Sequence, residues 1–537
     1  MGFHLDLFII FVSFPVIFAL DVTNVTLLLD GTKTIAETDA NFICATLDLW
    51  PPQKCNYNNC PWGASSALNL DLSNPLFAKA IQAFNGLRMR IGGTLQDSLL
   101  YNIGHLRSPC HPFRRDDHAL FGFSRGCLLR SRWDELNAFF TKTRAIVTFG
   151  LNALYGRPKL KGNAWGGPWD STNAENLINY TVSKGYHIDS WEFGNELSGT
   201  GIGASIDAAQ YGNDITKLKE IINKLYHKSA SEPTLIAPGG FFDKEWFRKL
   251  LQVSGLNVVN FVTHHIYNLG PGSDLHLVDK ILNPTYLDKI SSLFKDVQQT
   301  VRQFGPWASA WVGESGGTYN SGGPGVSNTF VNSFWYLDQL GASSMYDTKV
   351  YCRQTMIGGN YGLLNTTTFA PNPDYYSALL WHRLMGQKVL PVMSDASGFL
   401  RTYAHCGKQK DEGVTLLFIN LSRNNKFLIN VKNILNRDEG KKYVNHDKYV
   451  GLKKLMWWVG KKASKNDVRR YEYHLTPQNR NIRSQIVLLN GKALEITGSG
   501  DIPSLDPLLV NINLPITIAP LSIAFVTLPN FEAPACV

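Results

Sequence analysis

The feature that most constrains the fold is a repeated alternation of short apolar segments with longer amphipathic ones. The apolar segments read as strands and are residues 41–49, 87–91, 145–151, 188–194, 234–237, 258–265, 310–314 and 348–352. The amphipathic segments read as helices and include residues 75–84, 133–143, 207–227, 287–304, 328–340 and 374–385. Eight such strand–helix units predict an α/β fold, a (β/α)8 TIM barrel over residues 37–388. A doubly wound open sheet is the alternative.

Two of the predicted strands end in a carboxylate. Glu196 closes the run from Trp191 to Leu197, and Glu314 closes the run that begins at Ala310. The carboxyl ends of parallel barrel strands share one face, so these two side chains are expected to meet there. Hydrolysis of a glycosidic bond needs such a pair, one protonating the leaving oxygen and one attacking the anomeric carbon or activating water. We assign Glu196 as the general acid/base and Glu314 as the nucleophile.

Polar residues near these acids extend the candidate site. Arg90, on the second strand, is placed to keep Glu314 ionised, although it could equally be the partner of Glu192 inside the barrel. Asn195, next to the predicted acid, can form a hydrogen bond with a sugar hydroxyl.

The sixth strand ends in His264, His265 and, one residue further, Tyr267. Adjacent strand residues point to opposite faces, so at most one of the two histidines readily faces the site; His264 is taken as the candidate, together with Tyr267. Tyr319 and Tyr361 lie in glycine-rich loops that could gather several donors around a carboxylate.

The alternation stops near residue 392. Short β-like runs follow, split by Gly, Asn, Asp and Pro, at residues 399–405, 414–420, 427–431, 471–475, 485–489, 508–512 and 522–528. They predict a small antiparallel β-sandwich over residues 389–537, completed by an N-terminal strand within residues 21–36. The boundary, near residues 387–391, is not sharply marked.

Residues 1–20 are apolar and contain no Lys or Arg. They fit a secretory signal peptide, with an uncleaved anchor as the alternative. Glycosylation sequons occur at four asparagines: Asn24, Asn179, Asn365 and Asn420. The sequence therefore predicts a secreted glycoprotein of the extracellular space or cell wall, with a vacuole or lysosome-like compartment as the alternative.

The chain has eight cysteines but no Cys-x-x-Cys or His-x-x-x-His spacing. No zinc site is predicted, and no metal or other cofactor. In an oxidising compartment some cysteines should pair. The candidate pairs are Cys55–Cys60, Cys110–Cys127 and Cys406–Cys536, whereas Cys44, inside an apolar strand, is expected to be a buried free thiol.

The net charge is +9, and residues 437–470 contribute eleven Lys or Arg against four Asp or Glu. Such a stretch is either a solvated loop or a patch that attracts acidic polysaccharide. A secreted chain is a poor candidate for nucleic-acid binding, and no protein partner is evident. Peripheral association with a membrane or cell wall remains an alternative.

Two short patterns suggest other activities and are rejected. Residues 313–317 match the Gly-x-Ser-x-Gly pattern of serine hydrolases, but the glycine-rich stretch that follows cannot begin the required helix. Residues 199–203 resemble a dinucleotide-binding loop but lack its final spacing.

Several motifs together resemble glycoside hydrolase family 79, most closely its plant heparanase-like and β-glucuronidase members. They are residues 50–52, 90–94, 149–154, 191–197, 263–270, 311–317 and 373–377. The resemblance implies a barrel plus β-sandwich, a retaining mechanism, and carboxyl groups of Glu196 and Glu314 about 5–5.5 Å apart. It also implies that the glucuronic acid ring is held by Asp48, Thr94, Asn195, Tyr319 and Tyr361, with His264 or His265 as the site histidine. Two departures are the retained segment 102–132 and the loop 320–323, which replaces a glycine triplet of the animal enzymes.

These features predict an exo-acting β-glucuronidase that removes glucuronic acid from plant glycans or phenolic glucuronides. The alternative within the class is heparanase-like endo-cleavage of an acidic polysaccharide. The alternative from another class is a non-catalytic protein that binds acidic polysaccharide.

Overall fold

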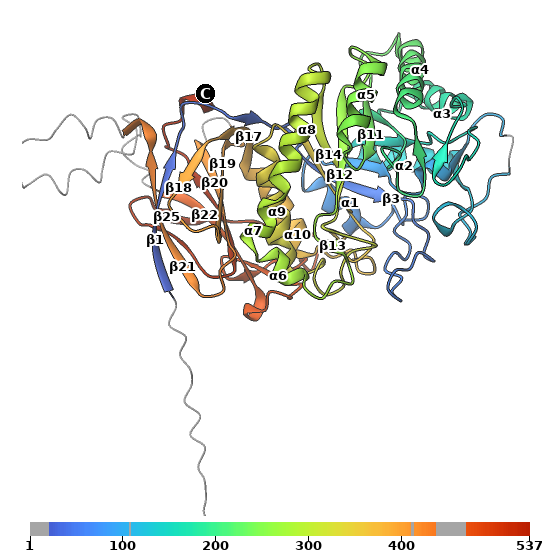
Figure 1. Cartoon of the computed structure of the whole chain (residues 1–537). Coiled ribbons are helices and arrows are strands. Elements are labelled where there is room, and N and C mark those ends of the chain that lie inside the picture. The colour runs from blue at the N-terminus through green and yellow to red at the C-terminus, as the bar shows by residue number, and fades with distance from the viewer. Residues whose placement is uncertain (1–20, 107–108, 410–412, 437–468) are drawn as a thin grey trace, which may run out of the picture.

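The computed structural model describes residues 21–106, 109–409, 413–436 and 469–537. A helix-covered barrel and a β-rich part lie side by side, with the N-terminal strand in the β-rich part (Figure 1). The predicted signal peptide and most of the predicted basic stretch, residues 437–468, lie outside the described residues.

Eight parallel strands close into a barrel, which confirms the predicted fold. Around the barrel the order is β11, β12, β14, β16, β3, β4, β7, β9. Their bounds are β3 Ile43–Asp48, β4 Arg88–Gly92, β7 Ile146–Leu151, β9 Ser190–Phe193, β11 Thr234–Gly240, β12 Phe261–Ile266, β14 Ser309–Ser315 and β16 Val350–Arg353. Nearly every residue of these strands is buried, because side chains fill the interior and helices cover the outside.

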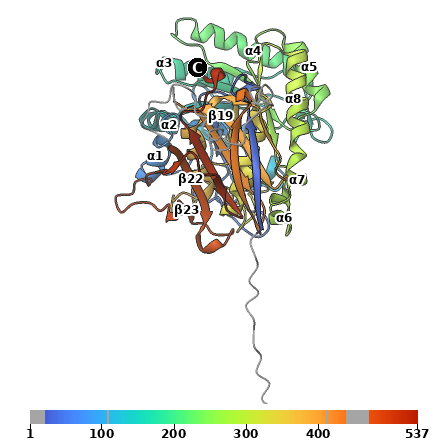
Figure 2. The same cartoon turned by 90° about the vertical axis from the view of Figure 1, so that its left-hand side faces the viewer.

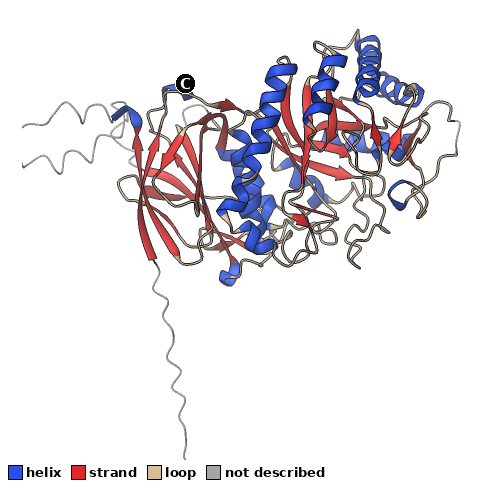
Figure 3. Cartoon of the chain, in the orientation of Figure 1, coloured by secondary structure: helices blue, strands red, loops and turns tan. Residues whose placement is uncertain are grey.

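Helices surround the barrel (Figure 3). Their bounds are α1 Pro75–Gln82, α2 Arg130–Thr143, α3 Thr172–Ser183, α4 Ala208–Tyr226, α5 Lys244–Ser254, α6 Leu277–Ile281, α7 Pro284–Asp288, α8 Ile290–Phe304, α9 Phe330–Ser344 and α10 Pro373–Leu384. Several begin at side-chain caps, such as Asn74 before α1 and Asp207 before α4. Helix α9 is buried on all sides, because it lies between the barrel and the β-rich part.

The β-rich part contains two sheets and faces the viewer in Figure 2. The smaller has the order β18, β1, β21, β26, with bounds Val392–Ser394, Asp21–Leu29, Asn425–Asn433 and Ile516–Ile518. The larger runs β2 Ala36–Glu37, β17 Met385–Leu390, β19 Leu400–Gly407, β20 Val414–Asn420, β27 Ser522–Leu528, β22 Arg469–Pro477, β23 Val487–Leu489 and β24 Lys492–Ala493, with β25 Leu508–Asn511 paired to β22. Apolar side chains between the two sheets form a separate core. Strand β1 thus lies in the sheet that the sequence expects it to complete.

Three two-stranded sheets lie in the loops between barrel strands and helices. They are β5 Leu99–Asn102 with β6 Gly126–Leu129, β8 Ala164–Trp165 with β10 Ser205–Ile206, and β13 Gly270–Pro271 with β15 Thr318–Tyr319.

The boundary between the two parts lies slightly earlier than expected. Strand β17 starts at Met385, directly after α10, and pairs with β19 of the larger sheet. Its Lys388 is also opposite Glu37 of β2. The barrel therefore ends at Leu384, because no loop separates its last helix from the first strand of the sandwich.

Four disulfides join the cysteines. The three predicted pairs, Cys55–Cys60, Cys110–Cys127 and Cys406–Cys536, are confirmed. The expectation of a free thiol at Cys44 is wrong: Cys44 on β3 is bonded to Cys352 on β16. These two residues face each other across the seam where the first and last strands close the barrel.

Among the described residues, no helix is both long and apolar enough to cross a lipid bilayer.

Candidate active site

The carboxylate of Glu314 reaches the barrel interior through a β-bulge. Along β14, His264 is opposite Val312 but His265 is opposite Glu314, so Gly313 is an extra residue. Trp311 lies in the cluster at the base of the barrel interior, and regular alternation from it would turn Glu314 outward. The bulge shifts the alternation, and Glu314 faces the site. A Cβ atom at position 313 would lie 3.2 Å from the Cβ of Thr263, so glycine fits this close approach.

Glu196 lies on a turn after β9 and adopts a left-handed backbone with φ of 54°. Its N–H donates to the carbonyl of Gly239 at 2.7 Å, and its own carbonyl accepts from Ile202 N–H at 3.0 Å. A non-glycine residue in this region carries a conformational cost, which these two bonds offset. The backbone is thereby fixed so that the side chain lies in the site.

The sequence left open whether Arg90 pairs with Glu314 or with Glu192. In the structure it contacts both carboxylates. Its Nε donates to Glu192 at 2.6 Å, its Nη1 to Glu314 Oε2 at 2.8 Å, and its Nη2 to Asn195 Oδ1 at 2.9 Å. All four side chains are buried. One planar guanidinium thus fixes a structural carboxylate, the predicted nucleophile and a predicted sugar ligand at once.

The two predicted catalytic groups differ in their surroundings. Both oxygens of Glu314 accept strong hydrogen bonds, one from Arg90 and the other from the Tyr267 hydroxyl at 2.5 Å. Burial raises the pKa of Glu196 to about 7, although the charge of Arg90 opposes the rise. This is the division of roles between an ionised nucleophile and a protonated acid.

The carboxylates are close together. A ligand atom each from Glu196, Glu314 and His265 lie within 4.8 Å of one another. Retaining glycosidases hold their carboxyl groups about 5–5.5 Å apart, whereas inverting ones leave about 6.5–9.5 Å for a water molecule. The spacing here fits direct attack on the sugar.

The histidine beside the acid is His265, and the prediction of His264 is wrong. His265 Nδ1 lies 3.0 Å from Glu196 Oε1, and burial lowers the pKa of His265 to about 3, so its ring is neutral. His265 shares the strand face of Thr263, which points inward, whereas the His264 ring packs against Phe294 of α8.

The other predicted sugar ligands surround the cavity to different degrees. Asp48 is buried at the end of β3, and burial together with the nearby Glu314 carboxylate raises its pKa well above the usual range. Asn195 keeps a buried Nδ2 that has no hydrogen-bond partner among the described residues and can donate to a hydroxyl. Thr94 is half-buried at the end of β4.

The two loop tyrosines differ in exposure. Tyr361 is buried and lies edge-on to Trp62, whereas Tyr319 is 43% exposed at the rim. In the loop that replaces the glycine triplet, Asn320 and Ser321 both adopt left-handed backbone, the conformation that glycine takes readily. The substituted loop therefore keeps a glycine-like path beside Tyr361.

Two buried residues that sequence reasoning missed position this site. Asp97 accepts from the N–H groups of Asn195 and Ala153, each at 2.7 Å, and so ties together the segments after β9 and β7. Gln354, after β16, bonds Thr46, Asp48 and the Tyr361 hydroxyl. Asp97 lies in a short 3-10 helix, Gln96–Ser98, and Gln354 in a loop, and neither belongs to a motif. Most of their partners are distant in sequence.

One predicted glycosylation site is also wrong. Asn420 is fully buried, and its amide nitrogen donates to backbone carbonyls of Asn425 and Ala519 at 2.8 Å. That nitrogen would carry the glycan, so the site is closed. Asn24 and Asn179 are exposed and Asn365 is half-buried.

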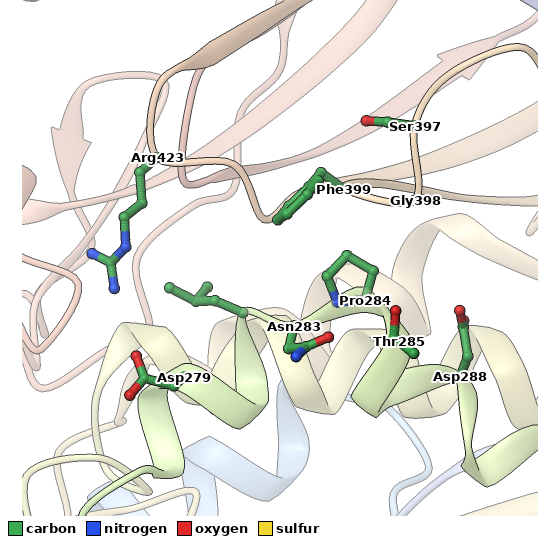
Figure 4. Close-up of a pocket in the computed structure, with 10 residues that line it drawn as sticks. Asp279, Asn283, Pro284, Thr285, Asp288, Ser397, Gly398, Phe399 and Arg423 are labelled. Carbon is green, nitrogen blue, oxygen red and sulfur yellow. The ribbon is translucent and has the colours of Figure 1, made fainter.

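A groove of about 560 Å³ lies elsewhere, between α6–α7 and two loops of the β-rich part (Figure 4). Phe399 and Arg423 line one wall, and Asn283 and Pro284 the other. It contains none of the residues that surround Glu196 and Glu314.

Comparison with known proteins agrees with this geometry. Residues 24–341 match the family model described as Glycosyl hydrolase family 79, N-terminal domain. The chain belongs to glycoside hydrolase family 79. Heparanase-like protein 1 of Arabidopsis thaliana is 55% identical over 100% of both chains. Baicalin-beta-D-glucuronidase of Scutellaria baicalensis is 42% identical over 92% of this chain and 90% of its own.

A solved structure shares the fold at low identity. A 4-O-alpha-L-rhamnosyl-beta-D-glucuronidase from Fusarium oxysporum has a TM-score of 0.62 and 14% identity, covering 94% of this chain and 100% of its own. As a family 79 member the chain is a glycoside hydrolase, not a serine hydrolase. Ser315 is accordingly buried, and its hydroxyl accepts from Tyr351 at 2.9 Å instead of facing the site.

Proposed function

We propose that this chain is a retaining exo-β-glucuronidase. The observation that carries the proposal is the pair Glu196 and Glu314, close together in one cavity, with surroundings that favour a protonated acid and an ionised nucleophile. Glu314 would attack the anomeric carbon while Glu196 protonates the leaving oxygen. Glu196 would then remove a proton from the water that releases the sugar.

The choice of an acidic sugar rests on two supports. Relatives that share most of this chain are named for glucuronide substrates. The Lys54 ammonium lies 4.2 Å from the Trp50 ring centroid and is close enough to Asp48 to interact with its charge. A cation in this wall of the cavity favours a substrate that carries a carboxylate.

We further propose that the chain follows the secretory route to the extracellular space or cell wall. Four disulfides support an oxidising compartment, and exposed sequons at Asn24 and Asn179 are compatible with glycosylation. Peripheral association with a membrane or wall would require the residues outside the described ranges, and belongs to the same proposal.

The test compares wild-type protein with Glu314→Gln on 4-methylumbelliferyl β-glucuronide and on the matching glucoside, galactoside and xyloside. We expect hydrolysis of the glucuronide, with kcat reduced by about 10⁴-fold or more in the variant. Product anomers followed by NMR should first appear in the β form. The matched control is Glu245→Gln, an exposed carboxylate on α5.

Undiminished turnover by Glu314→Gln would rule out the nucleophile. Preference for a neutral glycoside would rule out the glucuronidase. Release of short chains instead of monosaccharide from an acidic polysaccharide would favour endo-cleavage, and binding without any hydrolysis would favour a binding protein.

A further inference from the structure

The order of strands shows on which side of the cavity the leaving group departs. Glu196 follows β9, which adjoins β11 and then β12, whereas Asp48 ends β3, diametrically across the barrel from β11. The acid must contact the glycosidic oxygen, so the sugar extends towards Asp48 and the aglycone leaves over β11 and β12.

An exposed aromatic ring stands on that side. Phe241 directly follows β11 and is 40% exposed, although large apolar side chains around the site are otherwise mostly buried. Its ring centroid lies 6.4 Å from that of His265 and 6.3 Å from that of Tyr267. These two side chains contact Glu196 and Glu314 respectively, so Phe241 lies at the rim beside both acids. Its carbonyl accepts from the Ser198 hydroxyl at 3.0 Å, which fixes its backbone.

A second exposed apolar residue lies in the other segment that packs on the acid. Ile202 is 44% exposed, and its N–H donates to the Glu196 carbonyl at 3.0 Å. Asp243 borders this loop beside Gly199, and its carboxylate would repel an anionic chain. The leaving-group side thus carries apolar surface and an anion, which suits a neutral planar group better than a polyanionic polysaccharide.

We propose that Phe241, assisted by Ile202, forms an apolar platform that receives a planar aromatic aglycone. The proposal rests on the proposed function for the sugar and adds the class of leaving group, a phenol. An aromatic leaving group can stack on the Phe241 ring while its phenolic oxygen lies at Glu196.

The experiment measures kcat/KM for 4-methylumbelliferyl β-glucuronide and for β-glucuronyl fluoride, whose leaving group has no surface to stack. In Phe241→Ala the ratio of the aryl value to the fluoride value is expected to fall about tenfold, mostly through KM of the aryl substrate. Phe241→Trp should restore the ratio. Phe399→Ala is the matched control, because Phe399 is a similarly exposed ring in the remote groove of Figure 4.

An equal loss on both substrates would mean that Phe241 only supports His265 and Tyr267, and an unchanged ratio would mean that it does not bind the aglycone. Either result overturns the platform while the glucuronidase stands. If the wild type prefers another sugar, the same comparison is made with that sugar's aryl glycoside and fluoride, which separates the two proposals. Absence of any aryl glycoside hydrolysis would overturn both.

Discussion

At the scale of single residues, we expect Glu196 to set the alkaline limit of activity. Burial raises its pKa to about 7, and the acid form must protonate the leaving oxygen. The active fraction should therefore fall as pH rises through about 7. His265 adds no positive charge over this range, since its pKa lies near 3. We expect kcat/KM for an aryl glucuronide to show a falling limb with an apparent pKa near 7.

Glu196→Gln should abolish that limb and slow poorly activated leaving groups by about 10²–10⁴-fold, but good phenolate leaving groups less. A falling limb that survives in Glu196→Gln would show that another group carries the proton.

Arg90 neutralises the buried carboxylates of Glu192 and Glu314. Arg90→Met would leave Glu192, which is fully buried, without its cation, and would free both Glu314 and Asn195. We expect destabilisation of about 3–5 kcal/mol in urea unfolding, because a buried carboxylate loses its partner. Arg90→Lys should recover part of the stability but little activity, since an ammonium cannot reproduce three directed contacts. Equal stability of Arg90→Met and wild type would contradict this account.

The sequence predicts some site residues because their signal is local. Glu196 and Glu314 each end an apolar run, and Arg90 shares the face of its strand with other interior residues. The choice between His264 and His265 required knowing that Thr263 faces inward, which a run of consecutively buried residues does not reveal. Asp97 gives no local signal, because its role consists of contacts with residues more than fifty positions away.

At the scale of elements, the bulge in β14 sets the direction of Glu314, the proposed nucleophile. A methyl group at position 313 would press on Thr263 at 3.2 Å. We expect Gly313→Ala to reduce kcat by about tenfold or more, since a displacement of about 1 Å at the reacting group can cost about a hundredfold. KM should change little, because Asp48 and Asn195 are untouched.

If Gly313→Ala matched the wild type, the close approach at the bulge would not matter for catalysis. Neither the bulge nor its position could be predicted from the sequence, because a register shift depends on the neighbouring strand. The eight strands themselves could be predicted, since buried parallel strands form continuous apolar runs that glycine and proline interrupt.

At the scale of the whole molecule, the Cys44–Cys352 disulfide joins strands that are 308 residues apart in sequence and closes the barrel. Cross-linking so long a loop restricts the unfolded chain, so Cys44→Ala with Cys352→Ala should lower stability by about 2–5 kcal/mol. Thermal unfolding measures this, and activity at low temperature should persist, because the bond lies at the base of the interior and not at the site. Cys55→Ala with Cys60→Ala, which opens a five-residue separation, should cost less.

If Cys55→Ala with Cys60→Ala lowered the stability more than Cys44→Ala with Cys352→Ala, the argument from loop length would be contradicted. The sequence could not identify this bond, because strand parity makes Cys44 look like any interior residue until the last strand closes against the first.

The extra residue at Gly313 has a consequence for how such a chain could lose hydrolysis and keep sugar binding. If Gly313 instead paired with His265 in regular register, Glu314 would turn towards the surrounding helices while Asp48, Asn195 and Tyr361 still lined the cavity. A shift of register at one bulge would thereby separate sugar recognition from bond cleavage and leave a lectin in place of a hydrolase.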